Sequence, residues 1–596
     1  MKHKTEWNLG LMYSSPKDSK IEKDVVAIEK AIAAFAKKYS KNDKYLKDAG
    51  FLKKALDDYE SLDDIPSPMP YFYLFLDINS GHKDAEAGKN RISQRLTAAG
   101  NQLIFFRIAL GKIPKDMRKK FLADPKLAKY KYFLEQIFAS SKYNLTEAEE
   151  KIMSLKNLSS RELWVSGQES LLSKQTVTIS GKKMTLFEAS LKAKDFPTKQ
   201  RHAAYDIITS HLRSISDFAE SEMNAIVIDK KVSDELRGYS KPYSATILGY
   251  QNTEKEIESL VKTVSEHFPI AHRYHKIKAE MLGLKKLEYS DRAASVGETK
   301  KKITYTEAID IVGRSFRKAN PKYEAILHRY LQQGQIDAFP RKGKKSGAYC
   351  WSNVNLPTYV LLNHIENLDS VSTLAHEMGH AIHGEFSKTQ SPIYQGHTIS
   401  VAEVASTLFE NFAFDEVLET LTEKEKIIAL HDKIGDDVMT IFRQIALFNF
   451  EVELHQTIRE KGSMSKEDIA ALMNKHMKSY LGPIFEMKEN DGYTFITWSH
   501  IRRFFYVYSY AYGQIISKAL YKKYKEDKSY LSKIEEFLKA GESKSPEKIF
   551  KDIGINTSDP AFFKAGLESV KEDIIRLEKL VRSSKSKKSN HAITRN

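Results

Sequence analysis

The stretch TLAHEMGHAIHGEF, residues 373–386, holds two histidines four positions apart, with a glutamate directly after the first. Residues i and i+4 lie on one face of an α-helix, so His376 and His380 can both point at one metal ion. Glu377 lies about 100° further round the helix, off the metal but within reach of a metal-activated water. The pattern predicts a zinc site with its own general base on a helix.

The flanking residues support a helix at this position. Asp369 and Ser370 are candidate N-caps, and Gly379 costs about 1 kcal/mol relative to alanine inside a helix, which indicates close packing there. The apolar positions are Val371, Leu374, Ala375, Met378, Ala381 and Ile382. Because five letters also match by chance in a long chain, a third ligand must come from elsewhere.

The third ligand is not the next histidine. In the metzincin pattern, a glycine and a histidine would occupy positions 383 and 386, which here hold His383 and Phe386. We therefore predict that His383 is a packed or supporting residue. Downstream, Glu403 and Glu410 lie seven residues apart on one predicted helix face, and either could complete a site with two histidines and a carboxylate. Spacing alone leaves both open.

Composition predicts a mainly α protein. The 596 residues include only 16 prolines and 27 glycines, while lysine, glutamate, leucine and alanine abound. We expect a hairpin at 176–187, a domain boundary near 195 and short strands within 334–363 in an otherwise helical chain. Helical patterns extend to about 582.

Cysteine usage and hydropathy bear on location. Cys350 is the single cysteine, so no intramolecular disulfide can form. The N-terminus lacks the apolar core of a secretory signal, and no apolar stretch reaches the roughly 18 to 20 residues of a membrane span. We expect a cytoplasmic protein that does not enter the membrane.

The chain is basic, with 94 Lys and Arg against 78 Asp and Glu for a net charge of +16. Its lysines are interspersed with glutamates, which indicates solvated helix faces and no nucleic-acid partner. RKGKK, residues 341–345, is a denser cluster for which we expect attraction of acidic groups or peptide C-termini. The Lys- and Ser-rich tail, 583–596, is predicted to be disordered.

Several separated motifs resemble one family. LDSVSTLAHEMGHAIH followed by SVAEVASTLFEN resembles the signature of the thimet oligopeptidase and oligoendopeptidase F group of zinc metallopeptidases. GKKSGAYCW, WSHIRRFFYVYSYAYG (498–513) and the opening WNLGLMY resemble the oligoendopeptidase F branch in particular.

The resemblance implies roles for individual residues. It implies one Zn²⁺ per chain, with Glu403 as the third ligand and Glu410 orienting a zinc histidine. The segment before the zinc helix, 346–350, would be an edge strand that binds the substrate backbone, with Gly347, Ala348 and Tyr349 as contacts.

A second set of implied residues lies in the aromatic stretch 498–513. The resemblance implies that His500, with Tyr508 and Tyr510, stabilises the oxyanion of peptide hydrolysis. Position 505 is a phenylalanine here, so the choice among Tyr506, Tyr508, Tyr510 and Tyr512 stays open.

The implied architecture is a two-lobed helical metallopeptidase with a deep substrate channel and a small β-sheet beside the zinc helix. We expect a helical lobe at 1–195, a catalytic domain at 196–582 and the tail at 583–596. The expected activity is endopeptidase cleavage of oligopeptides. The alternatives are a related zinc dipeptidase or carboxypeptidase, and a non-enzymatic basic binding protein.

Overall fold

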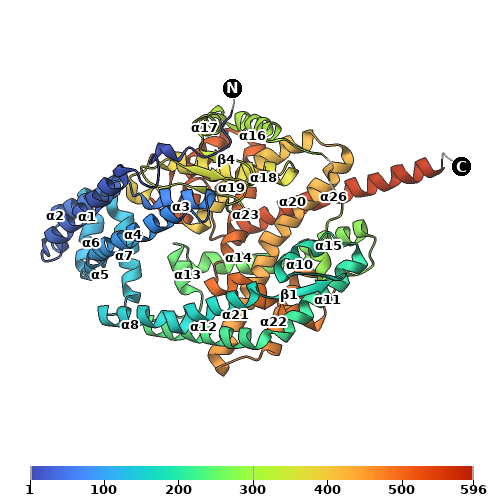
Figure 1. Ribbon diagram of the computed structural model, residues 1–596, viewed down its shortest axis with the longest axis horizontal. Helices are drawn as coiled ribbons and strands as arrows, with labels where there is room; N and C mark the ends of the chain where they lie inside the picture. Colours follow the sequence, from blue (N-terminus) through green and yellow to red (C-terminus); the bar gives the residue numbers. More distant parts are fainter. Residues whose placement is uncertain (1–2, 298, 300, 594–596) are drawn as a thin grey trace. The chain divides into compact units, whose positions relative to one another are not determined.

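The computed structural model describes residues 3–297, 299 and 301–593. The chain forms two compact units, each assembled from three separate segments. Unit 1 comprises Met1–Lys142, Lys301–Glu419 and Lys523–Ile553, and unit 2 comprises Tyr143–Lys300, Thr420–Lys522 and Gly554–Asn596. Helices dominate both units, which confirms the prediction of a mainly α fold (Figure 1).

Unit 1 contains helices from both halves of the chain and one three-stranded sheet. Its helices are α1 (Ser19–Tyr39), α2 (Ala49–Glu60), α3 (Met69–Ile78), α4 (Lys83–Gly100), α5 (Ile104–Gly111), α6 (Lys115–Ala123), α7 (Lys131–Ser140), α16 (Tyr305–Ala319), α17 (Pro321–Gln333), α18 (Leu368–Ser387), α19 (Ile399–Glu419), α24 (Leu531–Lys539) and α25 (Pro546–Asp552). Its strands are β4 (Ile336–Asp337), β5 (Tyr349–Trp351) and β6 (Tyr359–Leu361).

Unit 2 is helical apart from two pairs of short strands. Its helices are α8 (Glu147–Asn157), α9 (Leu163–Ser173), α10 (Leu186–Ala193), α11 (Thr198–Ser214), α12 (Ser216–Arg237), α13 (Ser244–Gly249), α14 (Glu254–Glu266), α15 (Pro269–Leu282), α20 (Glu423–Asp437), α21 (Gln444–Lys461), α22 (Lys466–Leu481), α23 (Tyr508–Glu526, whose last turn belongs to unit 1) and α26 (Pro560–Ile593). The strands are β1 (Thr176–Ile179), β2 (Lys182–Thr185), β3 (Leu287–Glu288) and β7 (Phe485–Glu486).

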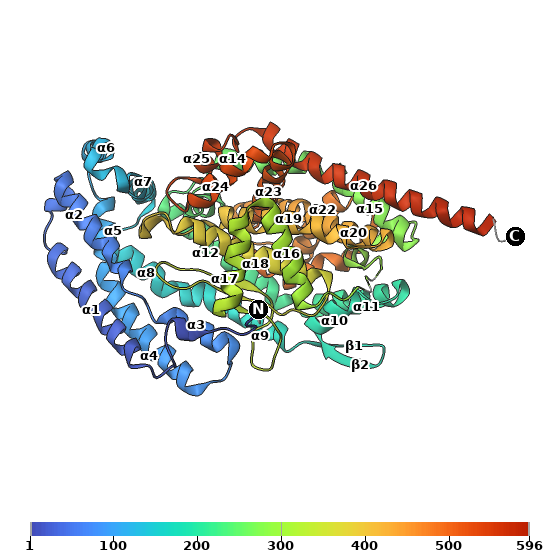
Figure 2. The same cartoon turned by 90° about the horizontal axis from the view of Figure 1, so that it is seen from above.

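Local sequence signals explain several elements. Helices α8, α14, α16 and α20 each begin with a Thr-x-x-Glu capping box, in which the two side chains satisfy each other's backbone amides. In the predicted hairpin, β1 pairs with β2 around Ser180 and Gly181, both of which have positive φ (51° and 77°), as the tight turn requires. In unit 1, α1 and α4 lie side by side in both views, where Arg95 forms ion pairs with Glu22 and Glu29 (Figures 1 and 2).

The sheet of unit 1 has the order β4-β6-β5, so β5 is an edge strand. Strand β4 is parallel and β5 antiparallel to β6, with Cys350 opposite Val360. The Val360 amide donates to the Gln335 carbonyl on the β4 side (2.8 Å), so the backbone groups of Cys350 face the open edge. The prediction of an edge strand before the zinc helix is confirmed, although the strand begins at Tyr349 and not at Ser346.

The predicted boundary near 195 does not coincide with a boundary between the units. Residues 143–195 belong to unit 2 because β1, α9 and α10 pack against α11 and α12, the next two helices in sequence. The start of the predicted tail also differs, since α26 continues through Ile593 and leaves only 594–596 outside the described residues. Each residue added to an existing helix gains a hydrogen bond without a new nucleation step, which accounts for this extension. Among the described residues, no helix is long and apolar enough to span a membrane.

Three of the four basic side chains in the cluster 341–345 form ion pairs with two carboxylates of unit 1, contrary to the expectation that the cluster is available to substrate. The guanidinium of Arg341 pairs with Asp337 at 2.5 Å, and Lys344, whose side chain is 0% exposed, approaches the same carboxylate at 2.7 Å. Lys345 pairs with Asp77 at 3.3 Å. Asp337 is itself fully buried and therefore requires these cations.

Candidate metal centre and active site

Helix α18 presents the two motif histidines on one face. The helix is capped by Asn367, whose side chain accepts from the Ser370 amide at 2.9 Å, so the N-cap lies two residues before the predicted Asp369. The rings of His376 and His380 are 4.9 Å apart between centroids. Their spacing by one helical turn therefore brings both imidazoles to one point.

Helix α19 supplies a carboxylate to the same point. One oxygen of Glu403 lies 3.5 Å from Nε2 of His376 and 3.8 Å from Nε2 of His380. Ser406 donates to this oxygen at 3.1 Å and restrains the carboxylate. Ligands about 2.1 Å from a tetrahedral zinc lie about 3.4 Å from one another. The three side chains, whose ligand atoms all lie within 4.8 Å of one another, fit a zinc ion.

Gly379 determines how closely α18 and α19 approach. A Cβ atom at this position would lie 2.7 Å from the Ser406 Cα and 3.0 Å from the Phe409 Cβ. The first of these neighbours is backbone, which cannot move aside as a flexible side chain can. The close packing that the mid-helix glycine predicts is confirmed, and it brings Glu403 within reach of the histidines.

Glu410 lies two turns beyond Glu403 and contacts the other nitrogen of His376. Its Oε1 forms a short hydrogen bond with Nδ1 of His376. Such a bond leaves Nε2 free to bind a metal. Burial lowers the pKa of His376, but the Glu410 carboxylate raises it to about 9. For His380, burial and the neighbouring His376 lower the pKa to about 4.

Glu377 lies beside these ligands and is only 6% exposed. Burial raises its pKa to about 7, assisted by Glu403 and opposed by His376 and by a hydrogen bond from the Cys350 backbone. A carboxyl group with this pKa can both accept and release a proton near neutrality. Glu377 therefore lies next to the candidate ligands, where the sequence motif predicts a general base.

These side chains line a cavity of about 530 Å³ in unit 1. Of the predicted substrate contacts, Ala348 and Tyr349 line it together with Cys350, while Gly347 precedes β5 with a φ of 81° and is not part of the lining. Asn363 donates to the Gly347 carbonyl at 2.7 Å, which fixes the chain as it enters the edge strand. The cavity thus combines the metal ligands with an open strand edge.

His397 also lines this cavity, and the sequence reasoning missed it. Its ring contacts that of His383, with centroids 3.6 Å apart and planes tilted by 47°, and Nε2 of each ring lacks a hydrogen-bond partner among the described residues. Burial is the main cause that lowers the pKa of both, so both are neutral. His383 is 2% exposed, as expected for a packed residue. His397 stands alone before α19, where no spacing links it to the motif.

In unit 2, His500 forms a cluster with two tyrosines. The Tyr510 hydroxyl lies 3.4 Å from Nε2 of His500 and 3.2 Å from the Tyr506 hydroxyl. The Tyr506 ring stacks on His500, with centroids 5.1 Å apart and planes 13° apart. Tyr508 differs from the predicted arrangement: it is fully buried, and its hydroxyl donates to Asn252 at 3.0 Å. Tyr512 is likewise buried and hydrogen-bonded to Glu256.

The backbone between His500 and α23 explains which tyrosines face the histidine. Phe504 and Phe505 both have positive φ (46° and 61°), an unusual conformation for aromatic residues. The Phe505 amide donates to the buried Glu451 carboxyl at 2.7 Å, which holds the turn. The turn shifts the register of the aromatic stretch, so Tyr506 and Tyr510 face His500 and Tyr508 enters the core.

Comparisons with known proteins give a family and a fold. Residues 193–569 match peptidase family M3, and residues 110–174 match the family described as Oligopeptidase F. The chain is 24% identical to group B oligopeptidase PepB of Streptococcus agalactiae, over 98% of each chain. It is 26% identical to an oligoendopeptidase F homologue of Borreliella burgdorferi, over 95% of this chain and 98% of that one. The crystal structure of oligoendopeptidase-F from Enterococcus faecium matches with a TM-score of 0.69 and 20% identity, over 95% and 99% of the two chains.

Proposed function

This chain belongs to peptidase family M3, and on that premise we propose that it is a zinc-dependent oligoendopeptidase that hydrolyses internal bonds of short peptides. The observation that carries the proposal is the convergence of His376, His380 and Glu403 with Glu377 beside them in one cavity. Family membership favours an enzyme over a non-enzymatic basic binding protein.

Each side chain has one role in the proposed reaction. His376, His380 and Glu403 hold Zn²⁺, and Glu410 fixes the tautomer of His376. Zinc, when bound, polarises a carbonyl and lowers the pKa of a water toward neutrality. Glu377 accepts the proton of the attacking water and passes it to the leaving amine.

The substrate backbone is proposed to add to the open edge of β5. The C=O of Cys350 faces that edge and can accept a backbone hydrogen bond, as in other cases of strand addition, whereas its N–H donates to Glu377. The oxyanion role that the resemblance implies for His500 stays a prediction, and within unit 2 the tyrosines that contact His500 are Tyr510 and Tyr506. The deep channel and the limit on substrate length stay predictions.

Internally quenched peptides blocked at both ends test the proposal. We expect cleavage at internal bonds, loss of activity with a chelator and recovery with one equivalent of Zn²⁺. A dipeptidase or carboxypeptidase built on the same residues would leave blocked peptides intact and release one or two residues from free ones. Product masses distinguish these outcomes.

A further inference from the structure

Unit 2 contains a cavity of about 320 Å³ beside His500 that is rich in positive charge. Its basic side chains other than His500 are Lys194, Arg201, Arg292 and Arg443. Among the described residues, no aspartate or glutamate lines it, although several serines and threonines do. The arginines among these cations differ in whether they already form an ion pair with a carboxylate.

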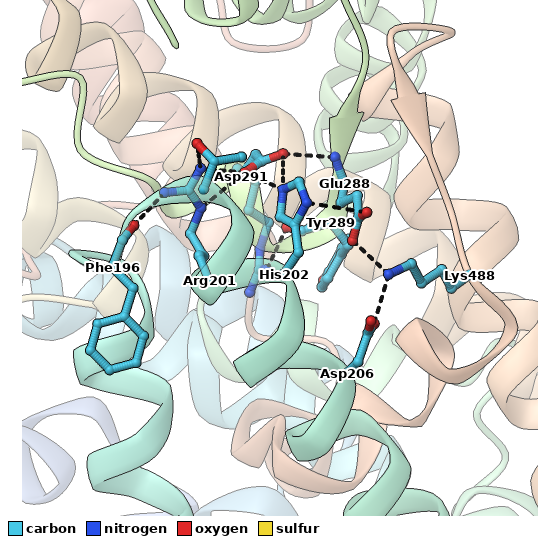
Figure 3. A network of polar contacts seen from close by, with 10 residues as sticks. Phe196, Arg201, His202, Asp206, Glu288, Tyr289, Asp291 and Lys488 are labelled. Carbon is cyan, nitrogen blue, oxygen red and sulfur yellow. Dashed lines mark hydrogen bonds and ion pairs between the residues drawn. The ribbon is translucent and has the colours of Figure 1, made fainter. Parts of the chain in front are cut away.

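Arg201 already forms an ion pair with a carboxylate, that of Asp291 (Figure 3). Its guanidinium donates to Asp291 at 2.6 and 2.9 Å, and His202 lies 2.9 Å from the same carboxylate. The Glu288 amide also donates to Asp291, at 2.8 Å. Arg201 is therefore neutralised, and the network fixes the 3₁₀ turn Tyr289–Ala293.

Arg292 follows Asp291 in that turn and has no carboxylate partner within the described part of the chain. Its guanidinium lies 4.0 Å from the centre of the Tyr289 ring and donates to the Tyr289 carbonyl at 3.0 Å. Its Nε is buried and lacks a hydrogen-bond partner among the described residues. The groups that it contacts directly are uncharged, and the nearby Asp491 carboxyl, whose pKa burial raises and the charge of Arg292 lowers, forms no ion pair with it within the described residues.

Arg443 has the same property and approaches the cavity from another element. It ends a π-helical turn, Val438–Arg443, and such turns occur often at functional sites. Its Nε is buried without a partner, and no ion pair joins it to any described carboxylate. Burial lowers the pKa of His500, and the charge of Arg443 lowers it further, which indicates that the two residues are close.

We propose that this cavity binds a carboxylate of the peptide substrate between Arg443 and Arg292, with Lys194 at its exposed rim. The inference rests on the proposed function and deepens it. Partly buried guanidiniums without a counter-ion are costly, and a carboxylate supplies bidentate hydrogen bonds that compensate them. The carboxylate is either the free C-terminus of a peptide or an Asp or Glu side chain.

Matched peptides distinguish these two sources. One pair differs only in a C-terminal acid or amide, and a second set replaces Glu by Gln at each position of an amidated peptide. With the zinc-loaded protein we expect kcat/KM to be at least about tenfold higher for the carboxylate member of one set, as for a charged hydrogen bond. Equal kcat/KM for every pair would overturn the proposal.

Variants assign the preference to this cavity. In Arg443→Gln and Arg292→Gln, the ratio of kcat/KM between the paired peptides should fall toward one, and Arg443→Lys should retain part of it. If an arginine variant does not fold, the same ratio is measured for Lys194→Gln, whose side chain lies at the exposed rim, and it should also fall. Arg576→Gln removes an exposed charge from α26 and should leave the ratio unchanged. A ratio that survives in both arginine variants contradicts the assignment.

Binding separates this inference from the proposed function. Fluorescence anisotropy of labelled peptides on the Glu377→Gln protein reports the same preference without hydrolysis. If the unaltered protein cleaves neither peptide but the Glu377→Gln protein binds the acid more tightly, the enzymatic proposal fails and the carboxylate site stands. If blocked peptides are cleaved but no preference is found in binding or cleavage, the carboxylate site fails alone.

Discussion

Glu377 provides the first test at the scale of single residues. Glu377→Gln keeps the shape of the side chain but cannot accept a proton. We expect kcat to fall by about 10²- to 10⁴-fold, with one Zn²⁺ still bound, because the three ligands are untouched. Steady-state kinetics with metal analysis of the same sample checks this result, and a variant that stays active would show that another group is the base.

Glu410 should affect metal affinity more directly than any other residue that does not bind the metal. Glu410→Gln weakens the bond that orients His376, so zinc affinity should fall by about 10- to 100-fold, measured by competition with a chelator. Glu419→Gln is a matched control, because Glu419 ends the same helix with a side chain that is 69% exposed. Equal affinities in the two variants would remove Glu410 from this role.

Replacing tyrosine by phenylalanine should affect activity at two positions of the aromatic stretch and stability at a third. Tyr510→Phe and Tyr506→Phe should lower kcat with little change in the free energy of unfolding. For a true oxyanion donor the loss is about 10²- to 10³-fold. Tyr508→Phe should spare kcat but cost about 1 to 3 kcal/mol, because it leaves the buried Asn252 oxygen without its donor. Kinetics and chemical denaturation of the three variants give the comparison.

The sequence predicted the metal-site residues better than the aromatic ones. His376 and His380 follow from helical periodicity, which is local. Glu403 and Glu410 share a helix face, so their roles depend on how α19 crosses α18, which spacing does not encode. The family resemblance implied Tyr508 beside His500, and the positive φ angles of Phe504 and Phe505 that precede its buried position leave no mark in the residue pattern.

At the scale of elements, the contact between α18 and α19 is the most sensitive point. Gly379→Ala would place a methyl group 2.7 Å from the Ser406 backbone. We expect a loss of about 1 to 3 kcal/mol in the free energy of unfolding, together with weaker zinc binding as the helices separate. Thermal denaturation and chelator competition measure the two effects.

Gly384 is a matched control on the same helix. A Cβ at Gly384 would lie 2.7 Å from the Ser352 hydroxyl, which can rotate away, and 3.2 Å from the Ser352 Cβ, so no backbone atom is among these contacts. Gly384→Ala should therefore be the milder change in both measurements. If Gly384→Ala costs as much as Gly379→Ala, the backbone contact is not what makes Gly379 necessary.

At the scale of the whole molecule, buried histidines predict sensitivity to acid. His455 packs against Phe504 and Phe505, and burial, with the charges of Arg459 and Lys230, holds its pKa well below 6.5. Protons therefore bind the imidazole of His455 more readily in the unfolded chain. The contribution of neutral His455 to the free energy of unfolding is fully present above pH 6.5 and is lost progressively as the pH drops below it. The slope is at most about 1.4 kcal/mol per pH unit for each such histidine.

His455→Leu tests this linkage. The apolar side chain removes the titrating group, so the free energy of unfolding should fall less between pH 7 and pH 5 than in the unaltered protein. Denaturant unfolding at several pH values gives both slopes. An unchanged slope would show that other groups, such as the similarly buried His275, account for the acid sensitivity.

The division of the chain was the least predictable feature at this scale. A new helical run that begins after FPTKQR, residues 196–201, predicts a boundary near 195, but the segment 143–195 packs against α11 and α12, which follow that position. A boundary set by contacts between distant segments leaves no local signal in Pro, Gly or charge content. The helical content needed no such contacts and was predicted from composition.

The interleaved segments of unit 1 constrain how the protein can be made. Its first segment ends at Lys142 and its last begins at Lys523, so 381 residues separate their emergence from the ribosome. At about 5 to 20 residues per second the first and last segments appear roughly 20 to 80 s apart. The core around Phe35 and Phe106 is built from N-terminal residues alone, whereas the core around Tyr71 and Phe72 is completed only by Leu356 to Leu361 of the second segment. During translation the apolar faces around Tyr71 and Phe72 have only the earlier part of the chain to pack against, so unit 1 should depend on chaperones more than its stability alone suggests.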